Sequence, residues 1–174
     1  MTGKILAGLV VVSAIVAAAA MYYLQVYAFY DPVNAPDDGV YMTTYAGSEE
    51  RIIAKDFQGI DADSSPIRYR ACFTTPHSIA MLSETFEIYD TAEPLTAPGW
   101  FDCFDAETIA DELHAGQAVA FLGKKNIAYG VDRVIAVNSD GQAYAWHQLN
   151  NCGEKSYDGS AVGEECPPRE SGAE

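Results

Sequence analysis

The sequence predicts an α+β protein with one N-terminal transmembrane helix and a mainly antiparallel β-sheet domain that carries two short helices. The segment from Ile5 to Leu24 has 20 residues without a charge, and Ser13 is its one strongly polar side chain. After it, short runs rich in β-branched and aromatic residues alternate with residues that favour turns. Strand-like runs outnumber helical runs and the connections are short, which indicates an antiparallel sheet.

The apolar segment has the length of a membrane span, because about 20 helical residues cross a hydrocarbon core about 30 Å thick. The competing interpretation is a signal peptide, with Lys4 as its basic end and cleavage after Ala20. We favour an uncleaved span over residues 5–26, since signal peptides have shorter apolar regions of about 7–15 residues. Aromatic side chains collect at membrane interfaces, and those expected there are Tyr22, Tyr23, Tyr27, Phe29 and Tyr30.

Charge predicts the orientation of the span. Lys4 and the N-terminus are the positive groups before it, whereas Asp31, Asp37 and Asp38 follow it. Lys and Arg residues near a span tend to stay in the cytoplasm. We therefore expect residues 1–4 in the cytoplasm and the C-terminal domain in the periplasm, with the protein crossing a bacterial inner membrane once.

The chain after the span is strongly acidic. From Asp31 onward, nine Lys and Arg residues stand against 25 Asp and Glu residues, which gives a net charge of −16. Binding to nucleic acid or to anionic headgroups requires a positive surface, so the composition argues against both. An acidic surface attracts basic partners, although acidity also simply keeps a protein soluble.

The four cysteines, Cys72, Cys103, Cys152 and Cys166, form neither a CxxC nor a CxxCH motif. An even number outside the cytoplasm favours disulfides, for which three pairings are possible. We favour Cys72–Cys103, because both lie beside aromatic residues in RACF and FDCF. Cys152–Cys166 would then close a loop of about 15 residues in the tail.

Three sections follow the span. Residues 27–38 are expected as a linker, because the stretch from Asp31 to Asp38 holds two prolines and three acids without periodicity. Residues 39–151 form the α+β domain, and residues 152–174 form an acidic tail rich in Gly and Pro. Strands are expected at 39–46, 51–61, 66–73, 86–90, 117–123, 127–138 and 142–149, with turns at 47–48, 61–66, 124–126 and 139–141.

Two helices are expected in the domain. Thr75 and Pro76 suit the N-cap and the first position of a short helix over about 77–84. Asp105 suits the N-cap of a second helix, which Gly116 ends.

No pattern indicates a metal or catalytic site. A calcium-loop pattern begins at Asp61, but its sixth position is Pro66, where glycine is needed for the sharp turn. The histidines, His77, His114 and His147, lack metal-binding spacing. His147 lies near Cys152, and we interpret it as structural in preference to half of a metal or thiol site. Nucleophile motifs and phosphate-binding glycine loops are absent, so we expect no enzyme, no cofactor and no metal.

The segments PGWFDCFDAETIADEL and GVDRVIAVNSDGQAYAWHQLNNC resemble a family of uncharacterised single-anchor membrane proteins of alphaproteobacteria. The resemblance extends over nearly the whole chain. Members are sometimes labelled histidine kinases, but this sequence lacks a Gly-rich nucleotide lid and a helical segment with a phospho-acceptor histidine. The resemblance implies a location in the inner membrane and no particular activity.

We expect a non-enzymatic accessory subunit or assembly factor of a larger membrane complex, with a respiratory complex as first choice. Its partners would be the lipid bilayer and an integral membrane complex, such as a respiratory oxidase or the basic cytochrome c that donates to it. The alternative is a periplasmic module that binds or senses a small molecule, with Trp100 and Trp146 lining the pocket. A third interpretation, an enzyme or a thiol or metal chaperone, would use the cysteines and His147.

Overall fold

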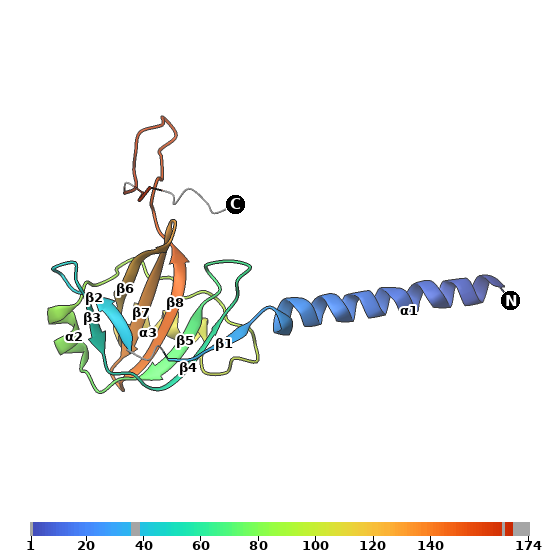
Figure 1. The fold of residues 1–174 in the computed structure, drawn as a ribbon, viewed down its shortest axis with the longest axis horizontal. Coiled ribbons are helices and arrows are strands. Elements are labelled where there is room, and N and C mark those ends of the chain that lie inside the picture. The colour runs from blue at the N-terminus through green and yellow to red at the C-terminus, as the bar shows by residue number, and fades with distance from the viewer. Residues whose placement is uncertain (1, 36–38, 165, 169–174) are drawn as a thin grey trace.

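A long N-terminal helix and one large antiparallel sheet dominate the computed structural model of the protein (Figure 1). Residues 2–35, 39–164 and 166–168 are described. The six strands of the sheet, in spatial order, are β1 (Asp31–Val33), β4 (Lys55–Asp61), β5 (Arg70–Thr74), β8 (Gln142–Leu149), β7 (Val131–Asn138) and β6 (Ala118–Ala128). All neighbouring strands run antiparallel. The predicted α+β class, with an apolar N-terminal helix, is confirmed.

The N-terminal helix projects away from the β1 edge of the sheet (Figure 1). It consists of α1 (Thr2–Tyr23) and a π-helical turn, η1 (Leu24–Ala28). Residues 3–23 are exposed throughout, and the helix is long and apolar enough to cross a membrane. The hydroxyl of Ser13 donates to the carbonyl oxygen of Val10 at 2.9 Å, so its polar group is satisfied within the helix.

Secondary structure covers both faces of the sheet. On one face lie β2 (Val40–Thr43) and β3 (Glu49–Ile52), which pair with each other, together with α2 (Ile79–Thr85). On the other face lie α3 (Ala106–His114) and the loop before it. Two hydrophobic clusters therefore form, with the sheet between them.

Strand β7 lies between these clusters and is buried on both sides. Ile135 and Val137 belong to one cluster, Val134 and Ala136 belong to the other, and all four side chains are 0% exposed. Successive side chains of a strand point to opposite faces. A strand covered on both faces is therefore apolar without alternation, as the run VIAV is.

The two predicted helices are present, but one begins at a different cap. Asp105 caps α3 as predicted, because its Oδ1 accepts from Glu107 N at 3.0 Å. For α2, the predicted N-cap at Thr75 is wrong, and Ser78 takes this role by accepting from Met81 N at 3.3 Å. The reason is that the backbone N–H of Thr75 donates to the carbonyl of Gly141, which holds Thr75 at the end of β5.

The strand predicted over 51–61 is wrong, because this segment contains two strands in different sheets. Residues up to Ile52 belong to β3 and pair with β2, whereas Lys55 begins β4 in the large sheet. The chain changes sheets at Ile53 and Ala54, and Asp56 then adopts a φ of +52° in an irregular stretch of β4. The strand predicted over 66–73 also begins later, at Arg70.

The turn predicted at 124–126 is wrong as well. Strand β6 continues through these residues to Ala128, with two register shifts against β7. Asn126 adopts a φ of +50° inside this irregular stretch, and its backbone N–H donates to Asp132 instead of to the opposite backbone. The reversal occurs at Gly130, whose φ of +71° suits a tight turn.

Part of the segment expected as a linker is a strand. β1 pairs with β4 through Asp31 opposite Asp61 and Val33 opposite Gly59. Pro32 is compatible with this strand because β1 lies at the edge of the sheet. The remaining linker residues Pro36, Asp37 and Asp38 lie outside the described residues, as do Met1, Glu165 and the end of the tail, 169–174.

The disulfides join the pairs that we favour from the sequence. Cys72 on β5 binds Cys103 in the loop before α3, and Cys152 binds Cys166 in the tail. The first disulfide fixes a long loop to the centre of the sheet. The second closes the tail into a ring beside the β7–β8 end of the sheet (Figure 1).

The close contact between Gly141, in the turn from β7 to β8, and Thr75, after β5, can be tested by substitution. Gly47 and Gly141 both have a φ of +80°, so Gly→Ala costs about 1 kcal/mol of backbone strain at either position. Only at Gly141 would the new Cβ lie 2.6 Å from the carbonyl oxygen of Thr75. We expect Gly141→Ala to lower the free energy of unfolding by about 1–3 kcal/mol more than Gly47→Ala. Urea unfolding of the full chain in detergent, followed by near-UV circular dichroism, measures the free energy of unfolding of both variants. Equal losses of this free energy would contradict the contact between Gly141 and Thr75.

Candidate functional site

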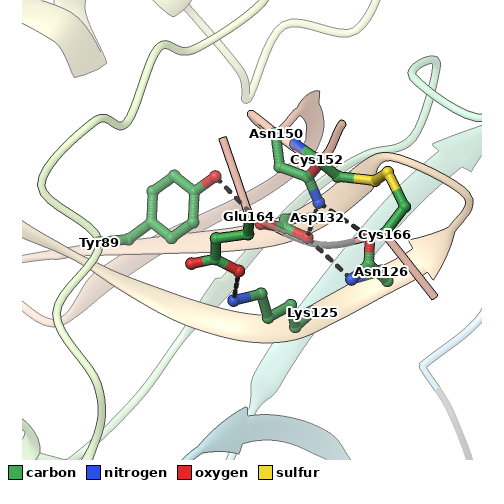
Figure 2. A network of polar contacts seen from close by, with 8 residues as sticks. All are labelled: Tyr89, Lys125, Asn126, Asp132, Asn150, Cys152, Glu164 and Cys166. Carbon is green, nitrogen blue, oxygen red and sulfur yellow. Dashed lines mark hydrogen bonds and ion pairs between the residues drawn. A yellow bond between two sulfur atoms is a disulfide. The ribbon is translucent and has the colours of Figure 1, made fainter. Parts of the chain in front are cut away.

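A buried carboxylate organises one end of the sheet. Asp132 is 3% exposed, and Figure 2 shows two side chains and one backbone group converging on it. Its Oδ1 accepts from Asn126 N at 2.8 Å and from Asn150 Nδ2 at 2.6 Å, and its Oδ2 accepts from the hydroxyl of Tyr89 at 3.1 Å. Asn150 Nδ2 also donates to Asn126 Oδ1 at 3.0 Å. Asp132 thereby ties together the β6 bulge, the end of β8 and the segment before α3.

Tyr89 remains a hydrogen-bond donor in this network. Burial raises the pKa of its hydroxyl to about 12, and the negative charge of Asp132 and the hydrogen bond to it act in the same direction. The hydroxyl therefore keeps its proton at neutral pH. A phenol in this state positions a carboxylate and does not serve as a base.

A polar cavity of about 420 Å³ opens beside this network, and we call it the Asp132 cleft. Lys125 contributes a positive charge to its wall and forms an ion pair with Glu164 of the tail (Figure 2). The hydrogen bond that Lys125 donates to the Glu164 carboxylate raises the pKa of Lys125. Further carboxylates line the wall: Glu87, Glu93 and Glu154. The cleft is therefore suited to a small cationic molecule. Within the described residues, no three His, Cys, Asp or Glu side chains are grouped to hold a metal ion.

The tail forms one wall of the Asp132 cleft. The backbone N–H of Gly153 donates to the carbonyl of Glu164 at 2.9 Å, and the adjacent Cys152–Cys166 disulfide closes the same ring (Figure 2). Residue Glu164 is thus held within reach of Lys125 by a covalent ring. The sequence predicted the disulfide, but not that it brings a carboxylate to the cleft.

The two tryptophans do not line this cleft, which corrects the pocket expected from the sequence. Trp146 is 0% exposed, and its indole N–H donates to Gln148 Oε1 at 3.0 Å. Trp100 lies at the end of the N-terminal helix instead. Neither indole is therefore placed to report on a molecule in the Asp132 cleft.

His147 is a structural residue on β8. Its Nε2 accepts from Arg133 Nε at 3.0 Å, so the proton of the neutral ring is on Nδ1, which donates to the carbonyl of Pro66 at 2.7 Å. Its ring stacks on Tyr69 with centroids 4.6 Å apart. Burial, followed by the positive charge of Arg133, lowers the pKa of His147 to about 4. Because Cys152 is in a disulfide, the considered histidine–thiol site does not form.

A second cluster joins the N-terminal helix to the domain. The indole N–H of Trp100 donates to the carbonyl of Val26 at 2.7 Å, which satisfies one of the acceptors left open at a helix end. The ring of Tyr27 stacks on Trp100 with centroids 6.0 Å apart, and Tyr30 meets it edge-on at 6.0 Å. Arg68 lies over the ring of Tyr30 at 5.5 Å. We call Tyr23, Tyr27, Tyr30 and Trp100 the aromatic junction.

The structure brings together some of the aromatic residues that the sequence predicts at the membrane interface. Tyr23 stacks on Tyr27, and Tyr22 meets Tyr27 edge-on, so the junction continues along the helix. Tyr22 and Phe29 remain 61% and 48% exposed. Trp100 completes the aromatic junction from the loop before α3. Its contact with the helix has no local sequence signal, because Val26 and Trp100 lie 74 residues apart.

Arg70 supports the loop that carries Trp100. Its buried guanidinium donates to the carbonyls of Leu95 (2.7 Å), Thr96 (3.2 Å), Ile67 (2.9 Å) and its own neighbour Tyr69 (2.7 Å). Burial lowers its pKa to about 10, so it stays charged at neutral pH. Arg70 and the nearby Cys72–Cys103 disulfide hold the two ends of this loop. The sequence indicated only an alternating polar residue of a strand at this position.

Residues 40–167 match a family of unknown function, DUF6446. The chain belongs to this family. No curated protein and no solved structure matches it. The matched region runs from β2 through Cys166, so it includes the Asp132 cleft and Trp100, whereas the N-terminal helix and β1 precede it. Membership agrees with the expected uncharacterised family and assigns no activity.

The role of Asp132 is tested by comparing two carboxylates of the cleft. Asp132→Asn replaces an acceptor of three hydrogen bonds by an amide with a donor end, and we expect it to lower the free energy of unfolding by about 2–3 kcal/mol. Glu164→Gln loses only an exposed ion pair, so its loss should stay below about 1 kcal/mol. Urea titration of the full chain at pH 7.5 compares them. Equal effects would show that Asp132 does not organise this end of the sheet.

The lowered pKa of His147 predicts a pH dependence of stability. The unfolded chain binds a proton near the ordinary pKa of 6.5, whereas the folded chain binds it only near 4. Stability is therefore full above the unfolded pKa and declines as the pH falls, by about 2 kcal/mol between pH 7 and pH 5. His147→Gln should flatten this slope, while the exposed His114→Gln should leave it unchanged. Urea unfolding at several pH values measures all three slopes, and an unchanged slope in His147→Gln would refute the assignment.

Proposed function

We propose that the protein is a non-enzymatic single-pass membrane protein that acts as an accessory subunit or assembly factor of a larger membrane complex. The aromatic junction is the observation that carries this proposal. Trp100 fixes the end of the helix to the domain, while residues 3–23 remain uncovered by the chain. A helix and a domain held in one orientation present a preorganised joint surface, which lowers the entropic cost of binding a partner that has parts in and outside the bilayer.

The use of the chemically active groups supports a non-enzymatic role. The oxygens of Asp132 accept three hydrogen bonds, His147 has both nitrogens engaged, and the four cysteines form disulfides. Each of these groups maintains the fold in its present state. Catalysis by any of these groups would require that group to be available to a substrate.

The proposed location is the inner membrane of a bacterium of the alphaproteobacterial type, with the N-terminus in the cytoplasm and the domain in the periplasm. Lys4 before the helix and acidic residues after it support this orientation. The two disulfides support an oxidising compartment for the domain.

The finer proposal is that the host is a respiratory complex, such as an oxidase supplied by cytochrome c. Its support is charge: the chain from Asp31 onward has a net charge of −16, and a basic electron carrier is attracted to such a surface. The acidic domain would then raise the local concentration of the carrier near its docking site, most strongly at low salt.

The Asp132 cleft supports a second candidate, a membrane-tethered module that binds or senses a small molecule. Its volume of about 420 Å³ is adequate for a metabolite, and its carboxylates favour a cation. The lining includes Glu164, so a ligand would meet the disulfide-bonded tail.

The proposal is tested by purification from native membranes. The tag is placed at the C-terminus, because the described residues of the tail, 152–164 and 166–168, lie away from α1 (Figure 1). We expect mild detergent to release the chain with a stoichiometric multi-span complex. A variant with Ile5 to Leu24 replaced by an unrelated Leu/Ala span should still enter the membrane but lose the complex, and a variant altered only at the exposed residue Tyr157 should keep it.

Three outcomes are distinguishable. Recovery of an oxidase would support the respiratory assignment, and recovery of another complex would replace it while keeping the accessory role. A chain that purifies alone in several mild detergents would refute the accessory role and favour ligand binding at the Asp132 cleft.

A further inference from the structure

The domain cannot stand far from the end of the helix. Only Phe29 and Tyr30 separate the last residue of η1, Ala28, from the first residue of β1, Asp31. Three extended steps of about 3.5 Å span at most about 10 Å. The edge of the sheet at β1 is therefore close to the helix end, as Figure 1 shows. A flexible spacer of the kind expected over residues 27–38 would have left the domain free to move away.

The length of the uncharged helical segment determines the depth at which the helix end lies in the bilayer. A hydrocarbon core about 30 Å thick takes about 20 helical residues, which the uncharged segment from Ile5 to Leu24 supplies. Val26 then lies about 3 Å beyond the core, within a headgroup layer about 5–7 Å thick. The indole nitrogen of Trp100 is 2.7 Å from the carbonyl oxygen of Val26. Trp100 is part of the domain, yet it lies at the depth of the headgroups.

We infer that the face of the domain around Trp100 lies directly against the phospholipid headgroup layer, so that Trp100 extends the interfacial aromatic belt from the helix to the domain. The chemistry suits this place, because an indole has a large apolar surface and a polar N–H, here satisfied by Val26. Tyr27 lies against its ring, and Tyr30 holds the Arg68 guanidinium nearby, where a headgroup phosphate can accept from it. The inference rests on the helix crossing a bilayer, and not on the identity of a partner complex.

The negative charge of the domain and the rigidity of the loop that carries Trp100 confine the membrane contact to this face. The net charge of −16 from Asp31 onward opposes adsorption of the rest of the domain to anionic lipids. Arg70 and the Cys72–Cys103 disulfide hold the loop of Trp100 against β5, and β5 pairs with β4, which pairs with β1. The orientation of the domain on the membrane is therefore defined by covalent and hydrogen-bonded links instead of by general electrostatic attraction.

The test uses tryptophan fluorescence of the full chain in nanodiscs of phosphatidylcholine, brominated at acyl positions near the headgroup or deep in the core. The two tryptophans are Trp100 and the buried Trp146, so the difference between wild type and Trp100→Phe isolates Trp100. We expect the shallow bromines to quench this component at least twofold more than the deep ones, and aqueous iodide to quench it weakly. Quenching by iodide without quenching by either lipid would overturn the inference, because Trp100 would then face water.

A measurement without substitutions covers the case in which Trp100→Phe disturbs the fold. Labelling with 5-fluorotryptophan gives one ¹⁹F resonance for each of the two tryptophans. A gadolinium chelate attached to the lipid headgroups is expected to broaden one resonance strongly and the other weakly. Weak broadening of both would overturn the inference. Because these nanodiscs contain no other protein, either result is independent of whether a host complex exists.

Discussion

The hydrogen bond from Trp100 to Val26 joins two parts of the chain that differ in the polarity of their surfaces. The helix carries apolar side chains outward over residues 3–23, and the sheet domain is strongly acidic. Such parts do not adhere to each other through apolar burial, because each is suited to its own surroundings. Aromatic rings with one polar group are compatible with both, and they occupy the junction between the two. The relative orientation of helix and domain thus depends on few contacts.

Two buried charges have corresponding roles at two sites of the domain. Arg70 donates to four backbone carbonyls and holds the loop of Trp100, whereas Asp132 accepts from three donors and holds the end of the sheet that forms the cleft. Both are satisfied by neutral partners, and not by the opposite charge. Removing such a group leaves several polar atoms buried without partners, which is costly. Segments without regular secondary structure are stabilised in this way at both sites.

One disulfide lies at each of these two sites. Cys72–Cys103 fixes the loop at the aromatic junction, and Cys152–Cys166 fixes the tail at the Asp132 cleft. Both surfaces that can meet a partner are therefore built from loops that are covalently closed. Loops are where binding surfaces usually lie, and closing them lowers the entropy lost when a partner binds.

The sequence by itself determined the features that depend on local pattern: the uncharged helix, the cap at Asp105, the hairpin at Gly141 and the apolar run of β7. It misplaced the reversal at 124–126 and the sheet change at Ile53, because a bulge and a change of sheet depend on partners distant in the chain. Only the tertiary structure brought Trp100 to Val26 and Tyr89 to Asp132, which are 74 and 43 residues apart. The local sequence indicates which polar groups need a hydrogen-bond partner. The tertiary structure determines which group becomes that partner, because the partners lie far apart in the chain.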